Sequence, residues 1–264
     1  MTPLAYWHVD AFADRPFRGN QAAVMPLDAW LPDEVLQAIA EENLFAETAF
    51  VVPDASGAAD WELRWFTPTS EVRLCGHATL ASGHVLLVRD GGDQLTFRTR
   101  QAGVLEVRRS DAGYELALPA IPTTPGEWPE AARLLGAEPH EVWRTPGYNL
   151  FLYADEAELR GLDPDLRSLG ALGNEQFICT ALGTATDVVS RVFVPGGGVD
   201  EDSVTGSAHA VLAPFWTAKL GRGSFTAHQA STRGGDLVCR LDGERVWLGG
   251  PCVTVVEGVF YLTG

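Results

Sequence analysis

Two short motifs contain the residue types needed to bind a small anion. They are Cys75-Gly76-His77 and Thr205-Gly206-Ser207. Each is followed by a mostly apolar stretch that predicts a buried helix. The first turn of a helix has free backbone N–H groups and the positive end of the helix dipole, which together attract an anion. We therefore predict that Gly76 and Gly206 bind a carboxylate, with His77 and Ser207 beside it.

Glu47 is the candidate for proton transfer. It lies in the segment 44–52, whose other residues are mostly apolar and predict a buried strand. A carboxylate in such a segment costs free energy unless it is paired or functional. A carboxyl group within reach of a substrate can act as a general acid or base. We predict that Glu47 does so; the alternative is a surface glutamate at a strand edge.

An acidic cluster at 200–202 precedes the second predicted helix. Carboxylates are stabilised near a helix N-terminus, so Asp202 can be a helix cap or a catalytic group. Polar residues gather around both motifs in greater number than capping requires. We therefore include Asp202 with Glu47 and His77 among the predicted catalytic residues.

Other arrangements of reactive residues are disfavoured by their spacing. Cys75 and His77 are two positions apart at a helix start, where side chains do not normally face each other, so a thiol–imidazole pair is not expected. His77 and His84 share a helix face, but no third ligand has a fixed spacing, so no metal is expected. No glycine-rich nucleotide-binding motif follows a predicted strand, and no cofactor is expected.

The elements that must position these residues occur twice along the chain. The matching segments are 64–68 with 191–195, 75–80 with 205–210, and 97–102 with 225–230. The first copy contains Arg-Trp-Phe-Thr-Pro and the second Arg-Val-Phe-Val-Pro, each before a predicted buried helix. Four ordered matches, counting the turns after the third pair, indicate an internal duplication.

Each copy predicts a strand, then a buried helix, then three short strands. Alternating apolar residues predict strands at 59–66 and 188–194, and near-continuous apolar patterns predict helices at 76–88 and 208–220. The simplest packing wraps a bent sheet around each helix. Four prolines within 119–129 predict an extended linker. We expect two halves, 1–120 and 121–264, with a last strand that can cross back to the first half.

The composition excludes several classes of protein. The chain has 264 residues and a formal net charge of −16, with no basic run that would attract nucleic acid. No segment approaches the length of a membrane span, and no targeting segment is recognised. The four cysteines lack the spacing of a zinc or redox site, which favours free thiols and a cytoplasmic location.

Taken together, these motifs resemble the PhzF-like isomerases of phenazine biosynthesis, which share the diaminopimelate epimerase fold. The residues that carry the resemblance are Val9-Asp-Ala-Phe12, Phe17-Arg-Gly-Asn20, Glu47-Thr-Ala-Phe50, Arg64 to Pro68, Cys75-Gly-His-Ala-Thr79 and Glu201-Asp-Ser-Val-Thr-Gly-Ser-Ala-His209. They extend over the whole chain.

The resemblance implies an α+β fold of two similar halves, each a mixed, barrel-like sheet around a central buried helix. It also implies an active site between the halves, a homodimer, and no cofactor. Glu47 matches the proton-shuttling carboxylate of the family. The positions matching substrate-contacting, assisting or backbone-donor residues are His77, Asp202, Ser207, Gly76 and Gly206, with Asn20 as a further substrate contact.

Some residues depart from the family pattern. Gln21 and Ser203 stand where proline is usual, which predicts looser turns. Related epimerases use two opposed cysteines, but here only Cys75 occupies a thiol position and Thr205 stands at its counterpart. A threonine hydroxyl is too weak an acid to serve as the second base, so a two-thiol racemase is disfavoured.

Three functions remain open from the sequence. The first is an isomerase in which Glu47 moves a proton between carbons of a small carboxylate-bearing metabolite. The second is an epimerase or racemase that acts at one stereocentre through Cys75. The third is a non-catalytic protein that binds a small acid. The sequence does not predict which metabolite is bound.

Overall fold

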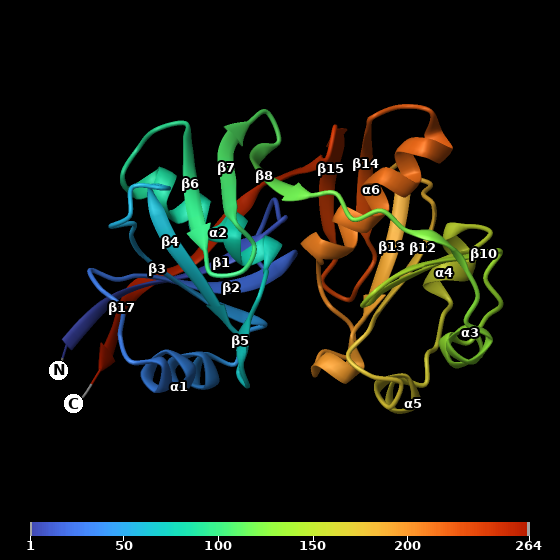
Figure 1. The fold of residues 1–264 in the computed structure, drawn as a ribbon, viewed down its shortest axis with the longest axis horizontal. Coiled ribbons are helices and arrows are strands. Elements are labelled where there is room, and N and C mark those ends of the chain that lie inside the picture. The colour runs from blue at the N-terminus through green and yellow to red at the C-terminus, as the bar shows by residue number, and fades with distance from the viewer. Residues whose placement is uncertain (1, 263–264) are drawn as a thin grey trace. The chain divides into compact units, whose positions relative to one another are not determined.

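The computed structural model describes residues 2–262 and divides the chain into two compact units. The first unit is Met1–Ala117 together with Gly249–Gly264, and the second is Leu118–Leu248. Each contains parallel and antiparallel strands and few helices (Figure 1), so the α+β class is confirmed. The division lies next to the boundary expected near residue 120, and the last strand belongs to the first unit.

The first unit is built from one run of hydrogen-bonded strands and two helices. Its elements are β1 (Thr2–Ala11), β2 (Asn20–Pro26), α1 (Asp33–Asn43), β3 (Glu47–Pro53), β4 (Trp61–Phe66), β5 (Glu71–Val72), α2 (Gly76–Arg89), β6 (Gln94–Thr99), β7 (Val104–Ser110), most of β8 (Gly113–Pro119), and β17 (Cys252–Leu262). The strands pair in the order β17, β1, β2, β3, β4, β6, β7, β8, and β5 adds to β4. The β2–β3 and β4–β6 pairs are parallel.

The second unit follows a similar order. Its elements are β9 (Thr124–Gly126), α3 (Pro129–Leu135), β10 (Glu141–Thr145), β11 (Tyr148–Leu152), α4 (Glu156–Arg160), α5 (Leu166–Gly170), β12 (Gln176–Leu182), β13 (Val188–Phe193), the 3-10 helix η1 (Pro195–Gly197), α6 (Gly206–Leu220), β14 (Ser224–Gln229), β15 (Gly235–Asp242) and most of β16 (Arg245–Gly250). Strands β9 to β15 pair consecutively, with parallel pairs at β11–β12 and β13–β14. The proline-rich segment is therefore not simply an extended linker, because β9 pairs with β10 and α3 begins at Pro129.

Helix α2 is covered on all sides, as its apolar sequence predicts. Every residue from Gly76 to Leu87 is buried, and the helix contacts β1, β2, β3, β6, β7 and β17. Helix α6 is likewise mostly buried and contacts β11 and β15. Neither helix has a polar stripe facing solvent, so each is held by side-chain packing around most of its circumference.

The structure corrects one of the sequence matches. β6 and β14 are both six residues long and have nearly the same order of buried and exposed positions. When the two strands are aligned from their first residues, Gln94 is equivalent to Ser224. Phe97 is then equivalent to Ala227 and not to Phe225. The 97–102 match was thus displaced by two residues. A shift of two keeps every side chain on the same face of a strand, so the predicted core faces were unaffected.

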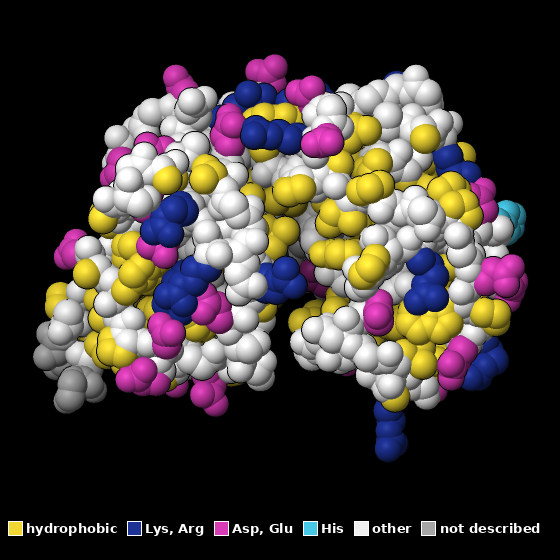
Figure 2. Space-filling view, in the orientation of Figure 1, with side chains coloured by type: hydrophobic (Ala, Val, Ile, Leu, Met, Phe, Trp, Pro, Cys, Tyr) yellow, Lys and Arg dark blue, Asp and Glu magenta, His cyan; other side chains and the backbone are white. Residues whose placement is uncertain are grey.

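The surface agrees with the composition. Figure 2 shows acidic and basic side chains scattered among apolar ones over the visible face of each unit. Within residues 2–262, no helix combines the length and apolar character that crossing a membrane requires.

A prediction follows from the close approach of α2 to β7. A Cβ on Gly83 would lie 2.3 Å from Val107 Cγ1 and 2.8 Å from Val107 Cβ. Gly83→Ala should therefore lower the free energy of unfolding by about 1–3 kcal/mol, although alanine is the better helix former. Chemical denaturation measures this. Gly258→Ala is the control, since no atom lies within 4 Å of its added Cβ. Equal stability of the two variants would contradict the proposed packing constraint.

Candidate active site

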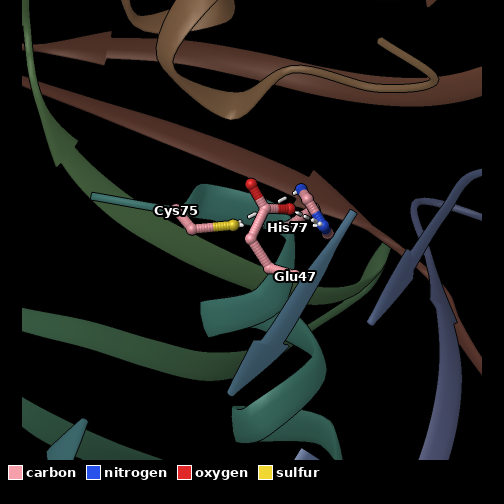
Figure 3. Close-up of side chains that lie close together, drawn as sticks. All are labelled: Glu47, Cys75 and His77. Carbon is pink, nitrogen blue, oxygen red and sulfur yellow. Dashed lines mark hydrogen bonds and ion pairs between the residues drawn. The ribbon is translucent and has the colours of Figure 1, made fainter. Parts of the chain in front are cut away.

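The first unit brings Glu47 and His77 into contact. Glu47 is the first residue of β3 and His77 is the second residue of α2. Glu47 Oε2 lies 3.0 Å from His77 Nε2, and their side chains are 18% and 5% exposed. Figure 3 shows the carboxyl group directed at the imidazole ring. The carboxylate is thus not a fully exposed surface glutamate: it is partly buried and paired with a buried imidazole.

Cys75 also contacts His77, which corrects the expectation from their spacing. The Cys75 Sγ lies 3.5 Å from His77 Nδ1 and 3.9 Å from Nε2 (Figure 3). Cys75 is the residue before the first turn of α2, and its backbone is extended, with φ −139° and ψ 110°. The rule that side chains two apart do not meet applies inside a helix and not at this position.

Asn20 completes the group around the imidazole. It is the first residue of β2, it is buried, and its Nδ2 lies 3.1 Å from His77 Nδ1. Both ring nitrogens of His77 therefore have polar neighbours. Because neighbours on both nitrogens restrain the ring, the orientation of His77 toward Glu47 is fixed by Asn20.

The surroundings of His77 favour its charged form. Burial alone lowers the pKa of an imidazole, but the adjacent Glu47 and the hydrogen-bonding contacts with Cys75 and Glu47 outweigh it and raise the pKa of His77 well above its usual value. Burial, with the charge of Glu47 adding to it, raises the pKa of the Cys75 thiol to about 11. The protonated form of His77 is therefore favoured, and Cys75 is held as a neutral thiol, which is a weak nucleophile.

The second unit holds a separate polar group at the start of α6. Thr205 Oγ1 donates to Asp202 Oδ2 over 2.6 Å, and the Thr205 N–H donates to Gln229 Oε1 over 2.8 Å. Gln229 Nε2 donates to the main-chain oxygen of Asp202 over 2.7 Å. Next along the helix, Gln176 Nε2 donates to Ser207 Oγ over 3.0 Å. Asp202 therefore supports the turn before Gly206 through the Thr205 hydroxyl, and the N-cap residue of α6 is Thr205, not Asp202.

The two groups occupy equivalent places in their units. β3 and β12 are seven residues long with the same order of buried positions, so Gln176 is the counterpart of Glu47. Ser207 is likewise the counterpart of His77, since each is the second residue of its helix. The contact between strand start and helix start is kept, but the second unit has an amide and a hydroxyl in place of ionisable groups.

An arginine anchors the turn before each helix; Arg64 is buried and Arg191 is partly buried. Arg64 on β4 donates through Nε and Nη2 to the two carboxylate oxygens of Glu71, over 2.8 and 2.7 Å. Arg191 on β13 makes the same two-pronged contact with Glu201, over 2.8 and 3.1 Å. This geometry explains why arginine begins both copies of the repeated strand motif: it holds the strand-to-helix turn against the strand.

Sequence reasoning missed two residues of these groups and one contact. The contact is that of Cys75 with His77, which their spacing disfavours. Gln176 was missed because the sequence does not align β12 with the segment that contains Glu47. Gln229 had been placed in a repeat match, yet its burial was overlooked; it is fully buried at the end of β14. Matching the polar residues that begin or end equivalent strands would have found both glutamines.

Glu47, Cys75 and His77 also form a group of possible metal ligands. One ligand atom from each residue can be chosen so that all lie within 4.8 Å of one another. His84, considered with His77 from the sequence, is instead packed elsewhere: its Nε2 lies 2.9 Å from Thr254 Oγ1 and its ring stacks edge-on with Tyr114. The candidate ligands come from β3 and α2, not from one helix face.

A cavity of about 520 Å³ in the second unit lies apart from these residues. It is lined by parts of β9, α3 and β10, including Trp128 and Trp143. Its carboxylate Glu141 is already occupied by Lys219 and by the Trp143 indole N–H. None of the predicted site residues lines this cavity, and we assign it no part in the chemistry.

Comparison with known proteins identifies the class. The sequence profile of the family described as phenazine biosynthesis-like protein matches residues 9–258, and the chain belongs to this family. An uncharacterized isomerase of Pseudomonas aeruginosa is 46% identical over 258 residues, covering 97% of each chain. The resemblance found in the sequence, and the prediction of an isomerase of this family, are thereby confirmed at the level of the family and enzyme class.

Solved structures of other proteins agree with the α+β fold described above. The crystal structure of a PhzF-family phenazine biosynthesis protein from Enterococcus faecalis has a TM-score of 0.92 and 39% identity, covering 99% of this chain and 100% of that one. A hydroxyproline epimerase from Agrobacterium vitis shares the fold with a TM-score of 0.60 at 12% identity, covering 97% of this chain and 92% of that one. The fold is therefore common to isomerases and epimerases.

His209, near the start of α6, should make the stability of the protein depend on pH. His209 Nδ1 lies 2.8 Å from the Thr205 main-chain oxygen, and burial lowers the pKa of His209 to about 4. Because this pKa lies below that of an unfolded histidine, the unfolded chain binds the extra proton between about pH 6.5 and 4, and stability falls as the pH drops through this range. The loss should reach about 3 kcal/mol.

Denaturation at a series of pH values measures this effect. His209→Gln keeps a donor for Thr205 but does not titrate, so the slope of unfolding free energy against pH should decrease in this variant. His140→Gln, at an exposed position, is the control and should leave the slope as it is. An unchanged slope in His209→Gln would contradict the assignment to His209.

Proposed function

We propose that this chain is a cofactor-independent isomerase in which Glu47 moves a proton between carbons of a small carboxylate-bearing metabolite. The observation that carries the proposal is the contact of the partly buried Glu47, through Oε2, with Nε2 of the buried His77 at 3.0 Å. Glu47 and His77 lie at the starts of β3 and α2, within the motifs that carry the family resemblance. Placing such a pair out of water costs free energy, which favours a catalytic use over a structural one.

The reaction balances without an external oxidant or reductant. An oxygen of Glu47 takes a proton from a carbon next to an electron-withdrawing group, and the C–H electrons move into the conjugated system. The resulting carboxylic acid then returns the proton to another carbon of that system. His77 contacts Oε2, so we propose that Oε1 carries the proton and that His77 holds the carboxyl group in place.

The helix starts supply the binding groups in this proposal. The N-terminal turns of α2 at Gly76 and of α6 at Gly206 bind anionic groups of the substrate and stabilise developing charge. Asn20 and Ser207 are the proposed polar substrate contacts. Asp202 acts by holding the turn before Gly206. The contacts of α2 with six strands of its own unit support the further proposal of a barrel-like sheet around each central helix.

An epimerase acting through Cys75 is the second candidate, and the contact of Cys75 with His77 favours it. Two observations weigh against it. Burial raises the pKa of the thiol to about 11, so little thiolate is present near neutrality. The counterpart of Cys75 is Thr205 and that of Glu47 is Gln176, so the second unit offers no second base at these positions.

The remaining expectations concern partners and location. We propose a homodimer, supported by apolar side chains on β17 that are unusually exposed, namely Val256, Val259 and Tyr261 at 45%, 50% and 62%. We further propose that the enzyme acts in the cytoplasm without nucleic acid or membrane partners, consistent with its net charge of −16. A passive acid-binding protein is the less favoured alternative, because it does not require a buried ion pair.

Glu47→Gln tests the mechanism. A substrate is first found by a metabolite screen for thermal stabilisation. In deuterated water the native enzyme should incorporate deuterium from solvent into it, and the variant should do so about 10²–10⁴ times more slowly. Glu42→Gln, an exposed glutamate on α1, is the matched control and should retain full exchange. Exchange at the native rate in Glu47→Gln would remove Glu47 from the mechanism.

Cys75→Ala separates the two candidate functions. If Glu47 alone moves the proton, the variant should keep most of the exchange rate, because the thiol does not transfer the proton. The epimerase route instead requires a loss of about 10²–10⁴-fold. Mass spectrometry measures the exchange, and the circular dichroism of the product distinguishes inversion at one centre from transfer between carbons.

A further inference from the structure

Glu47, Cys75 and His77 bring three different ligand atoms together. The Nε2 of His77 lies 3.0 Å from Glu47 Oε2 and 3.9 Å from Cys75 Sγ. In a tetrahedral zinc site, with bonds of about 2.0–2.3 Å, neighbouring ligand atoms are about 3.3–3.6 Å apart. Both distances are within about 1 Å of these values. All three ligand atoms lie within 4.8 Å of one another, so side-chain rotations that shorten the widest separation by about 1 Å would place them at bonding distance from one ion.

The chemistry of these ligands selects the metal. A thiolate, an imidazole and a carboxylate are the ligand types that zinc combines in proteins. Magnesium and calcium prefer oxygen ligands alone, so one carboxylate beside a sulfur does not suit them. Binding releases two protons, one from the Cys75 thiol and one from Nε2 of the protonated His77 ring, and three protein ligands leave the fourth position for water.

Access and support are also present. The Glu47 side chain is 18% exposed, whereas that of His77 is 5% exposed, so an ion can enter beside the carboxylate. Asn20 lies 3.1 Å from His77 Nδ1. With Nε2 bound to metal, Nδ1 carries the ring proton, and the Asn20 amide can turn its oxygen to accept it, as outer-sphere partners of zinc-bound histidines do.

We propose that Glu47, Cys75 and His77 bind Zn²⁺, and that the zinc-bound enzyme is inhibited. The binding depends only on the three side chains. The inhibition rests on the proposed function, because a carboxylate bound to zinc cannot accept a proton from the substrate. Zinc bound at Oε2 would withdraw negative charge from the carboxylate and so oppose the transfer of a proton to Oε1.

Cobalt(II) is the probe for binding, because its spectrum reports its ligands. Titration of the native protein should give one equivalent with visible bands of tetrahedral intensity and a sulfur-to-cobalt charge-transfer band, and Zn²⁺ should displace it. Cys75→Ser should lose the charge-transfer band and weaken zinc binding by more than about 100-fold, the upper end for losing an outer-sphere partner. Glu47→Gln should also weaken binding, which tests the site through a second ligand.

Cys252→Ser is the matched control, because Cys252 is the one partly exposed cysteine of the four. It should keep the charge-transfer band and the native affinity. Absence of the band in the native protein, or a band that persists in Cys75→Ser and disappears in Cys252→Ser, would overturn the site. Thermal unfolding of each variant checks that it is folded.

The exchange assay separates this inference from the proposed function. One equivalent of Zn²⁺ should abolish deuterium exchange, and a chelator should restore it. Zinc binding without loss of exchange would overturn the inhibition while leaving the site itself supported, and the role of Glu47 would then be decided by Glu47→Gln alone. No zinc binding, together with loss of exchange in Glu47→Gln, would overturn the site and leave the proposed function intact. Stimulation of exchange by zinc would overturn the inhibition.

Discussion

A carboxylate held beside an imidazole under apolar cover is the interaction on which the structure of this site depends. Glu47 and His77 are brought together because β3 and α2 both begin at the same place in the first unit. The two-pronged contact of Arg64 with Glu71 fixes the turn that leads into α2. Asn20 fixes the ring from its other side. The surrounding sheet and the close packing of α2 against β7 at Gly83 keep the first residues of β3 and α2 next to each other.

The two units use one scaffold for different electrostatics. Each unit has an arginine that binds a glutamate in the turn before the helix, and each brings the start of a strand against the start of that helix. Only the first unit has ionisable side chains where the strand and the helix begin. In the second unit Gln176 and Ser207 keep the hydrogen bond without the charge. A single charged centre suits the return of one proton by one group better than exchange between two bases.

Much of the fold could be predicted from sequence because burial patterns repeat with the elements. The buried helices, the division near residue 120 and Glu47 as the costly carboxylate all follow from such patterns. The contact of Cys75 with His77 could not, because it depends on the extended backbone before α2 and not on helical spacing. The roles of Gln176 and Gln229 could not be predicted, because their hydrogen-bond partners lie 31 and 24 residues away in the sequence and are brought close only by the fold.

The pairing of β17 with β1 has a consequence for how the chain folds. Residues 2–11 at the start of the chain lie along residues 252–262 at its end, while Leu118–Leu248 forms the other unit. The second unit is therefore inserted, in sequence, within the first. During synthesis it can be complete on the ribosome while the earlier residues still lack their final strand, so the part translated first is the part completed last.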